Sequence, residues 1–78
     1  PAWYELGNTL AEAGDLDGAL RNYRKAVELR PRYAEAYNRI GEILLGKGDT
    51  DGARSEFRKA LKANPWYTPA SENLKKAP

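Results

Sequence analysis

The chain has 78 residues, of which 41% are apolar and 31% are charged, and its formal net charge is +2. This length allows one small domain, and the composition is typical of a folded domain rather than a disordered one. The sequence contains no cysteine and no histidine, which excludes disulfides, thiol nucleophiles, cysteine metal sites and histidine general bases. No apolar run approaches the roughly 20 residues of a membrane span, and no signal-peptide pattern is present. Nothing in the sequence reports the compartment, so the cytoplasm is only the default expectation.

The first predicted element is an amphipathic helix that begins near Trp3. Its apolar residues recur every three or four positions, which places them on one helical face; they are Trp3, Leu6, Leu10 and Ala13. Gly14 interrupts this pattern and is expected to close the helix.

A second helix is predicted between Gly14 and Pro31, because proline disfavours helical geometry in the residue before it. Asp15 can cap this helix, and Asp17 lies in its first turn, near the positive end of the helix dipole. The apolar stripe consists of Leu16, Ala19, Leu20, Tyr23, Ala26 and Val27.

The same two helices are predicted again 34 residues later. Shifting the sequence by 34 gives 13 identities over the first 34 positions, and "GDLDGA" at 14–19 returns as "GDTDGA" at 48–53. The repeated stripes contain Tyr37, Ile40 and Leu44, then Ala53, Phe57, Ala60 and Leu61, and the second copy ends at Pro65. No alternating apolar pattern indicates a strand. Such self-similarity is typical of stacked helical repeats.

Gly7 and Gly41 lie inside the first helix of each pair, where glycine costs about 1 kcal/mol relative to alanine. A cost that is repeated indicates a repeated need, most simply the close approach of the partner helix. Tyr23 and Phe57 are expected to fill the space between neighbouring helices. The facing small surfaces are expected from Ala19, Ala26, Ala53 and Ala60.

These residues resemble the tetratricopeptide repeat, whose pattern is W-x2-L-G-x2-Y followed by alanine, an aromatic residue, alanine and proline. The first unit supplies Trp3, Leu6, Gly7, Leu10, Ala19, Tyr23, Ala26 and Pro31. The second supplies Tyr37, Ile40, Gly41, Leu44, Ala53, Phe57, Ala60 and Pro65. Leucine replaces the tyrosine of the pattern in both units, and Tyr37 replaces the tryptophan.

The resemblance implies one all-α domain over 1–78, an α–α superhelix of five helices. Repeat 1 is expected at about 1–33, repeat 2 at about 34–67 and a terminal helix at about 68–77. We expect Thr68 to cap the terminal helix, with Pro69 at its first position. This helix is interpreted either as a cap that covers Leu61 and Phe57 with a polar outer face, or as the first helix of a third repeat.

The two aspartates beside a glycine also suggest a calcium loop. With Gly18 at position 6 of such a loop, Asp15 and Asp17 fall at positions 3 and 5, but Arg24 replaces the essential glutamate at position 12. We therefore expect no metal and no cofactor. Many relatives carry glutamate at position 18, where it would complete a capping box with Asp15, so we expect Gly18→Glu to stabilise the helix start.

By resemblance, the first helix of each pair lines a concave groove that usually holds a peptide or a partner helix. The residues carried over to this groove are Tyr4, Glu5, Asn8, Glu12, Glu35, Asn38, Arg39, Glu42 and Leu45, with Ala11, Glu72, Asn73 and Lys76 beside them. We expect apolar contacts from Tyr4 and Leu45 and hydrogen bonds to a peptide backbone from Asn8 and Asn38. A neutral or basic segment is the expected partner, and an ordinary solvated face is the alternative.

One groove type in this family clamps the acidic C-terminal tails of heat-shock chaperones with lysines, asparagines and an arginine. Asn8 matches one clamp asparagine, but Tyr4 stands where a lysine belongs and Arg39 where another asparagine belongs. The four groove glutamates would also repel a carboxylate by about 1 kcal/mol per close exposed pair. The chaperone-tail interpretation is therefore disfavoured.

The sequence disfavours two other functions and leaves a third open as an alternative. The second helices are basic, but Glu28 and Glu56 interrupt the charge and no aromatic platform is evident, which disfavours nucleic acid. No nucleophile motif or phosphate-binding loop is present, so we expect no enzyme and no catalytic residue. Trp3, Trp66 and Tyr67 near the repeat ends favour self-association, and a self-assembling or purely structural repeat unit is therefore the alternative function. The mismatch between the units leaves both a natural and an engineered parent open and favours the natural one.

Overall fold

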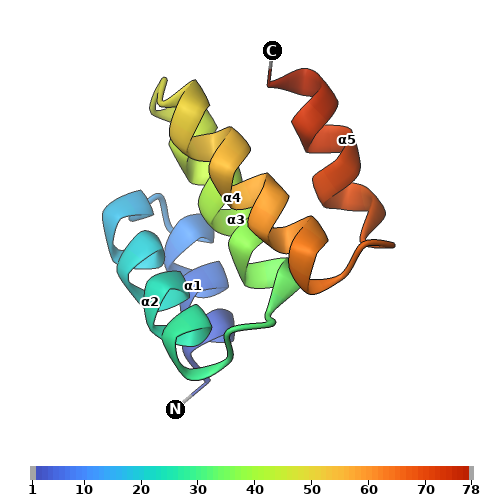
Figure 1. Cartoon of the computed structure of the whole chain (residues 1–78). Coiled ribbons are helices and arrows are strands. Elements are labelled where there is room, and N and C mark those ends of the chain that lie inside the picture. The colour runs from blue at the N-terminus through green and yellow to red at the C-terminus, as the bar shows by residue number, and fades with distance from the viewer. Residues whose placement is uncertain (1, 78) are drawn as a thin grey trace.

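The computed structural model describes residues 2–77, which form five helices and no strand. The helices are α1 (Trp3–Glu12), α2 (Leu16–Leu29), α3 (Ala34–Gly46), α4 (Thr50–Ala63) and α5 (Thr68–Lys76). Figure 1 shows two antiparallel pairs, α1 with α2 and α3 with α4, and α5 lying against the second pair. The predicted all-α class and the number of helices are confirmed, while the repeat boundaries near 33 and 67 stay a prediction.

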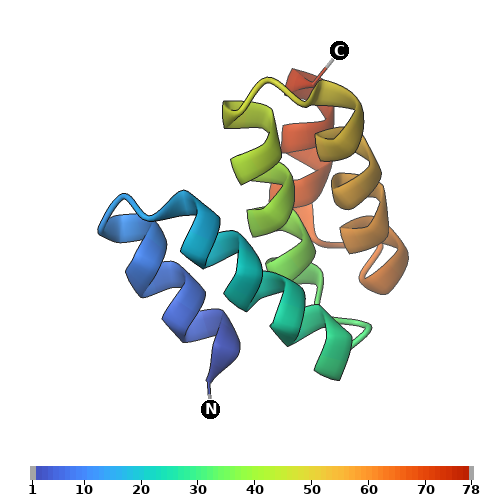
Figure 2. The same ribbon diagram turned by 90° about the vertical axis from the view of Figure 1, so that its left-hand side faces the viewer.

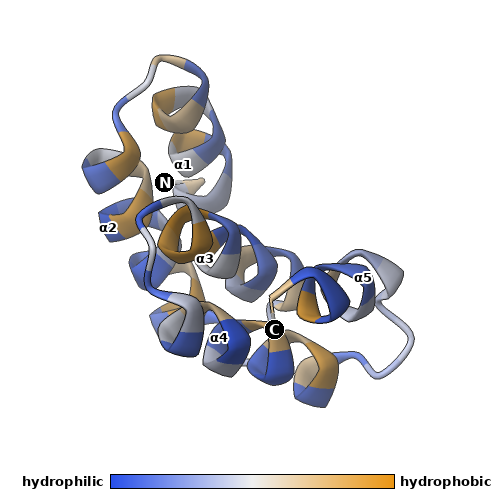
Figure 3. Ribbon diagram, turned by 90° about the horizontal axis from the view of Figure 1, so that it is seen from above, coloured by the Kyte–Doolittle hydropathy of each residue, from blue (hydrophilic) through white to orange (hydrophobic). Residues whose placement is uncertain are grey.

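The two pairs stack with a change of direction between them. In Figure 2 the first pair is tilted relative to the second. Seen from above, in Figure 3, α1, α3 and α5 lie along one side of a bent stack, and α2 and α4 lie along the other. The principal extents are 30 × 25 × 16 Å. None of the helices in residues 2–77 has both the length and the apolar character that crossing a membrane requires.

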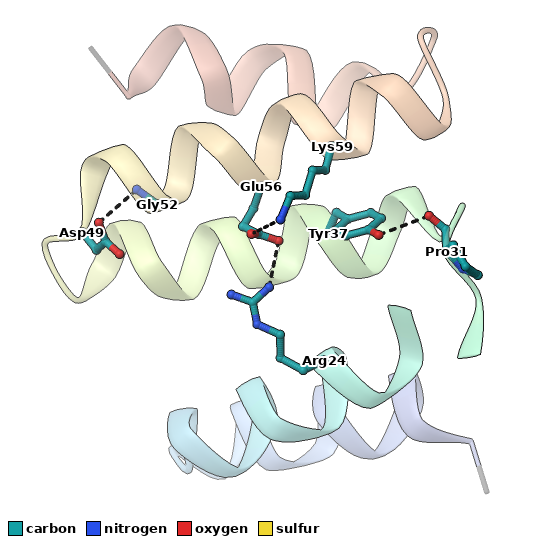
Figure 4. Close-up of polar contacts among 7 residues, drawn as sticks. All are labelled: Arg24, Pro31, Tyr37, Asp49, Gly52, Glu56 and Lys59. Atoms are coloured by element: carbon teal, nitrogen blue, oxygen red, sulfur yellow. Dashed lines mark hydrogen bonds and ion pairs between the residues drawn. The ribbon is translucent and has the colours of Figure 1, made fainter. Parts of the chain in front are cut away.

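Both turns within a pair are closed in the same way. Gly14 and Gly48 adopt φ of 89°, a conformation that favours glycine and ends the first helix of each pair. Asp15 and Asp49 then each accept a hydrogen bond of 2.9 Å through Oδ1 from the backbone N–H three residues later, and Figure 4 shows the second of these caps. The predicted glycine stops and aspartate caps are confirmed.

Gly18 lies close to the capping carboxylate of Asp15. A Cβ atom added there would lie 2.7 Å from Cγ of Asp15, inside the space of the capping carboxylate. Gly52 stands in the same relation to Asp49, at 2.8 Å. A side chain at position 18 therefore requires the Asp15 carboxylate to shift, which opposes the gain expected from Gly18→Glu, and that gain stays a prediction.

The prolines end α2 and α4 as expected. Arg30 and Asn64 precede the two prolines and adopt φ of −130° and −145°, outside helical geometry. The start of α5 differs from the prediction. Tyr67 is its N-cap residue and makes no side-chain cap, so Thr68 is the first residue of the helix rather than its cap. The backbone of Tyr67 (φ −77°, ψ 89°) repeats that of Tyr33 (φ −87°, ψ 83°), so the repeat itself sets where the helix begins.

Each pair is packed around one aromatic ring. Tyr23 is 1% exposed and Phe57 is fully buried, and the predicted small residues around them are buried as well, namely Ala19, Ala26, Ala53 and Ala60. A Cβ atom added at Gly7 would lie 2.5 Å from Cε1 of Tyr23, and one at Gly41 would lie 2.6 Å from Cδ1 of Phe57. The predicted close approach is confirmed, and the approaching group is the ring.

The two ends of the stack differ. At one end, α5 covers the second pair: Leu74 and Ala77 pack with Phe57, and Ala70 packs with Ala60. The exposed residues of α5 include Glu72, Lys75 and Lys76. At the other end, α1 has no covering helix in the described residues, and Leu6 is 44% exposed although its repeat equivalent, Ile40, is fully buried.

Candidate functional site

A groove of about 380 Å³ opens between α1 and α3, beside the turn that leads into α2. Its lining residues are Asn8, Ala11, Glu12, Leu16, Tyr23, Arg39, Glu42, Ile43 and Gly46. Tyr23 and Ile43 are buried, whereas the charged residues are exposed. The groove therefore offers an apolar base under charged side chains.

The structure brings together four of the nine residues carried over from the repeat pattern: Asn8, Glu12, Arg39 and Glu42. Sequence reasoning did not place Leu16, Tyr23, Ile43 and Gly46 in the groove. Leu16 and Tyr23 belong to the apolar stripe of α2, so the pattern assigned them to the core. The available signal in the sequence was the position of Leu16, which directly follows the turn. In the structure its side chain is 41% exposed.

Tyr23 and Asn8 form the polar anchor of the first pair. The Tyr23 hydroxyl donates a hydrogen bond to Oδ1 of Asn8. Burial raises the pKa of Tyr23 above its ordinary value, so the hydroxyl stays protonated and able to donate. The amide nitrogen of Asn8 makes no hydrogen bond within residues 2–77, and Asn8 is one of the residues that line the groove. This nitrogen is a donor without a partner among the described residues.

Arg39 and Glu42 of α3 form an ion pair. Nη1 of Arg39 donates to Glu42 at 3.1 Å, and Glu42 also accepts from Nδ2 of Asn73 at 3.1 Å. The pKa of Arg39 lies above its ordinary value, chiefly because of an interaction with the side chain of Tyr4 and then because of the charge of Glu42. Glu12 makes no ion pair within the described residues. Two carboxylates therefore face one guanidinium, and the groove is net negative.

Two predicted residues do not face the groove. Asn38 was expected to face solvent, but it is only 3% exposed, because α5 covers it and Nδ2 of Asn73 donates to its Oδ1 at 2.9 Å. Leu45 is half-buried and packs with the core around Phe57. Neither side chain is placed for the direct contacts expected from the sequence.

The three remaining predicted residues are not among those that line the groove. The ring of Tyr4 packs 4.9 Å from that of Tyr33 and 5.6 Å from that of Tyr23, measured between centroids. Tyr4 and Glu5 line a smaller hollow of about 170 Å³ near the N-terminal end of α1. Glu35 is exposed in the first turn of α3.

The described residues hold no group of three or more His, Cys, Asp or Glu side chains of the kind that could bind a metal ion. A family model described as tetratricopeptide repeat matches residues 4–66, which is most of the chain. A comparison with curated proteins gives no significant match.

Proposed function

The chain belongs to the tetratricopeptide repeat family, whose members generally mediate protein–protein interaction and are typically non-catalytic, and from this premise we propose that it binds a neutral or basic segment of a protein partner in the groove between α1 and α3. The segment is a peptide or a helix.

The observation that carries this proposal is the combination of an apolar base with a net negative rim. Leu16 and Ile43 suit an aliphatic side chain of the partner. Glu12, which has no ion-pair partner among the described residues, suits a lysine or arginine beside it. The amide nitrogen of Asn8 suits a backbone carbonyl. In this proposal, Arg39 and Glu42 orient one another at the far wall.

The other carried-over residues have supporting roles in this proposal. Tyr4 and Glu5 line the smaller hollow near the N-terminal end of α1, and Glu35 is exposed in the first turn of α3. Asn38 and Leu45 hold α3 against α5 and the core.

The test is a selection from a library of short peptides, followed by affinity measurements with variants. Glu12→Gln keeps the shape of the side chain and removes its charge, so basic peptides are expected to bind about fivefold more weakly. Asn8→Ala is expected to weaken every selected peptide, with circular dichroism confirming the fold. Arg58→Ala, on the exposed side of α4, is the matched control. A selection whose peptides bind all variants equally would contradict the groove.

The alternative is a self-assembling or purely structural unit. It is favoured by the exposed apolar side chains near the ends of the stack: Leu6 at 44%, Leu29 at 60% and Trp66 at 88% exposure. Light scattering over a range of concentrations separates the two. Growth of the mass with concentration that Leu6→Glu abolishes supports assembly, and a concentration-independent monomer counts against it.

A further inference from the structure

A second hollow, of about 450 Å³, lies between the segment that leads into α3 and the C-terminal half of α4. It is lined by Pro31, Arg32, Tyr37, Lys59, Lys62 and Ala63 and shares no residue with the groove. Figure 4 shows Pro31, Tyr37 and Lys59, three of its six residues, and the contacts that hold them.

The charge of this hollow is entirely positive: three of its six lining residues are cationic and none is a carboxylate. Lys59 donates to Glu56 at 3.1 Å, which holds its chain in place, and Glu56 is also paired with Arg24 at 3.1 Å. Arg32 and Lys62 make no ion pair within residues 2–77. Two cations are therefore available to a ligand.

The hollow also has an apolar wall of fixed orientation. The hydroxyl of Tyr37 donates to the carbonyl oxygen of Pro31 at 3.2 Å, which ties the ring to the segment before α3. Pro31 and Ala63 add apolar surface on either side. A hollow of this size and composition suits a side chain with an apolar neighbour better than a bare inorganic ion.

The first pair provides an internal comparison. Its equivalents of Lys59 and Lys62 are Lys25 and Glu28, and these two neutralise each other across 3.5 Å. The basic hollow is therefore a property of the second pair and not of the repeat pattern. Lys62, in place of the glutamate, adds a cation that the first pair lacks.

We propose that this hollow binds an acidic segment of a protein partner. A carboxylate of the segment lies between Arg32 and Lys62, and an adjacent apolar or aromatic side chain packs on Tyr37. A protein is favoured over a nucleic acid because the three cations converge in one hollow. Duplex binding uses a row of cations along several phosphates, and Glu56 and Asp51 interrupt such a row on α4.

The test uses a fluorescein-labelled pentapeptide, Glu-Glu-Phe-Glu-Glu, and its Gln-Gln-Phe-Gln-Gln counterpart, with binding followed by anisotropy. The acidic peptide is expected to bind about tenfold more tightly than the neutral one. Lys62→Glu, which introduces the residue type of the first pair, is expected to weaken it at least about fivefold. Lys75→Glu makes the same change of charge on α5 and is expected to leave binding within about twofold.

Amide chemical-shift changes locate the site and separate this proposal from the groove. Signals of Tyr37 and Lys59 are expected to move, and those of Glu12 and Ile43 to stay. Movement at Glu12 and Ile43 instead would overturn the second site and also contradict a groove for basic segments. If only the second site fails, the groove signals stay unmoved by the acidic peptide and still respond to a basic one.

Three further outcomes overturn the proposal. One is the absence of binding by the acidic peptide at about 1 mM, the limit of useful affinity. Another is an equal loss in Lys62→Glu and Lys75→Glu, which would indicate non-specific attraction. The last is tighter binding of a thymidine decanucleotide than of the peptide. If Lys62→Glu lowers the melting temperature, the loss of acidic-peptide binding is measured with Arg32→Ala instead, at a residue outside any helix.

Discussion

The two helix pairs share one packing plan but differ at the ring that fills each core. In the first pair, the hydroxyl of Tyr23 donates to Asn8. In the second, Phe57 has no hydroxyl, and Glu42, the equivalent of Asn8, instead accepts from Arg39. The apolar positions are thus constrained by the repeat, whereas the polar positions around them are not. Differences in binding are therefore to be sought at these polar positions rather than in the core.

The largest expected effect concerns the two glycines under the rings. Gly41→Ala should destabilise the protein by about 1–3 kcal/mol, because the added methyl overpacks a well-filled core. Gly7→Ala should cost less, since Tyr23 borders the open groove and can shift toward it, whereas Phe57 is held by α5. Urea unfolding followed by circular dichroism measures both.

Gly46→Ala is the matched control for these variants, because a Cβ atom there meets nothing within 4 Å. It should stabilise the protein by about 0.5–1 kcal/mol through helix propensity alone. Equal costs at Gly7 and Gly41 would show that the groove gives the first ring no freedom to move.

The next effect concerns the salt bridge between Arg24 and Glu56, which connects α2 of the first helix pair with α4 of the second. Glu56 is only 4% exposed and is held by Arg24 of α2 and Lys59 of α4, as Figure 4 shows. Arg24→Ala removes the inter-pair partner and leaves a buried carboxylate with one cation, so a loss of about 1–3 kcal/mol is expected. The equivalent Arg58→Ala, at an exposed position without an ion pair in the described residues, should change stability by less than about 0.5 kcal/mol. Similar losses in the two variants would contradict the role of Glu56.

The parts of this structure that the sequence predicts are the local ones. Helix positions, glycine stops and aspartate caps follow from spacings within one unit, and the 34-residue period extends them to the next. The contact of Gly7 and Gly41 with the rings was also predictable, because a repeated cost needs a repeated cause. The prediction that Thr68 caps α5 is wrong, because it rested on capping preference alone; Thr68 is the first residue of the helix and Tyr67 is its N-cap residue.

The candidate site was predictable only in part, because its exposure depends on tertiary packing. Asn38 and Asn8 are both asparagines on the first helix of a pair. In the structure, α5 buries Asn38, whereas Asn8 lines the groove between α1 and α3. Leu16 belongs to a core stripe but lies at its open edge. The pair of Arg24 and Glu56 spans 32 residues, a separation at which no local pattern indicates contact.

A smaller effect concerns the hydroxyl that distinguishes the two rings. Tyr23→Phe makes the first ring like the second and removes the hydrogen bond to Asn8, which should cost about 1 kcal/mol. Because the pKa of Tyr23 is raised in the folded state, its contribution is complete below the ordinary value of about 10 and is lost as the pH rises through the raised value. The melting temperature of Tyr23→Phe should therefore fall less steeply with rising pH in the alkaline range. Tyr37→Phe is the control, and unchanged curves for Tyr23→Phe would contradict the prediction.

A change close to zero is expected at the first cap. Gly18→Ala gains about 0.5–1 kcal/mol of helix propensity but displaces the carboxylate of Asp15, whose cap is worth about 1 kcal/mol. In an Asp15→Ala background the same substitution should show its full gain. The difference between the two backgrounds is the coupling measured by a double-mutant cycle. Equal effects in both backgrounds would show that the cap adjusts without cost.

The last effect is a difference in pH dependence between the two helix pairs. Nζ of Lys47, at the end of α3, donates to Asp17 of α2 at 2.7 Å, whereas the equivalent Asp51 accepts from Arg54 of its own helix at 2.6 Å. The hydrogen bond from Lys47, and then its charge, hold the pKa of Asp17 below its ordinary value. The contribution of Asp17 to stability is therefore present above about pH 4 and is lost as the pH falls through the lowered value. Because Asp17 is exposed, high salt should weaken the pair.

Lys47→Gln should return the titration of the Asp17 carboxyl, followed by NMR, toward its ordinary value and flatten the acid limb of the melting curve. Arg54→Gln removes a pair that lies within one helix and should leave the titration of Asp17 unchanged. An Asp17 that titrates at its ordinary value in the unmodified protein would show that the cross-helix bond is not formed in solution. Lys47 would then contribute nothing to the contact between the two helix pairs, and that contact would rest on the core and on the pair of Arg24 with Glu56.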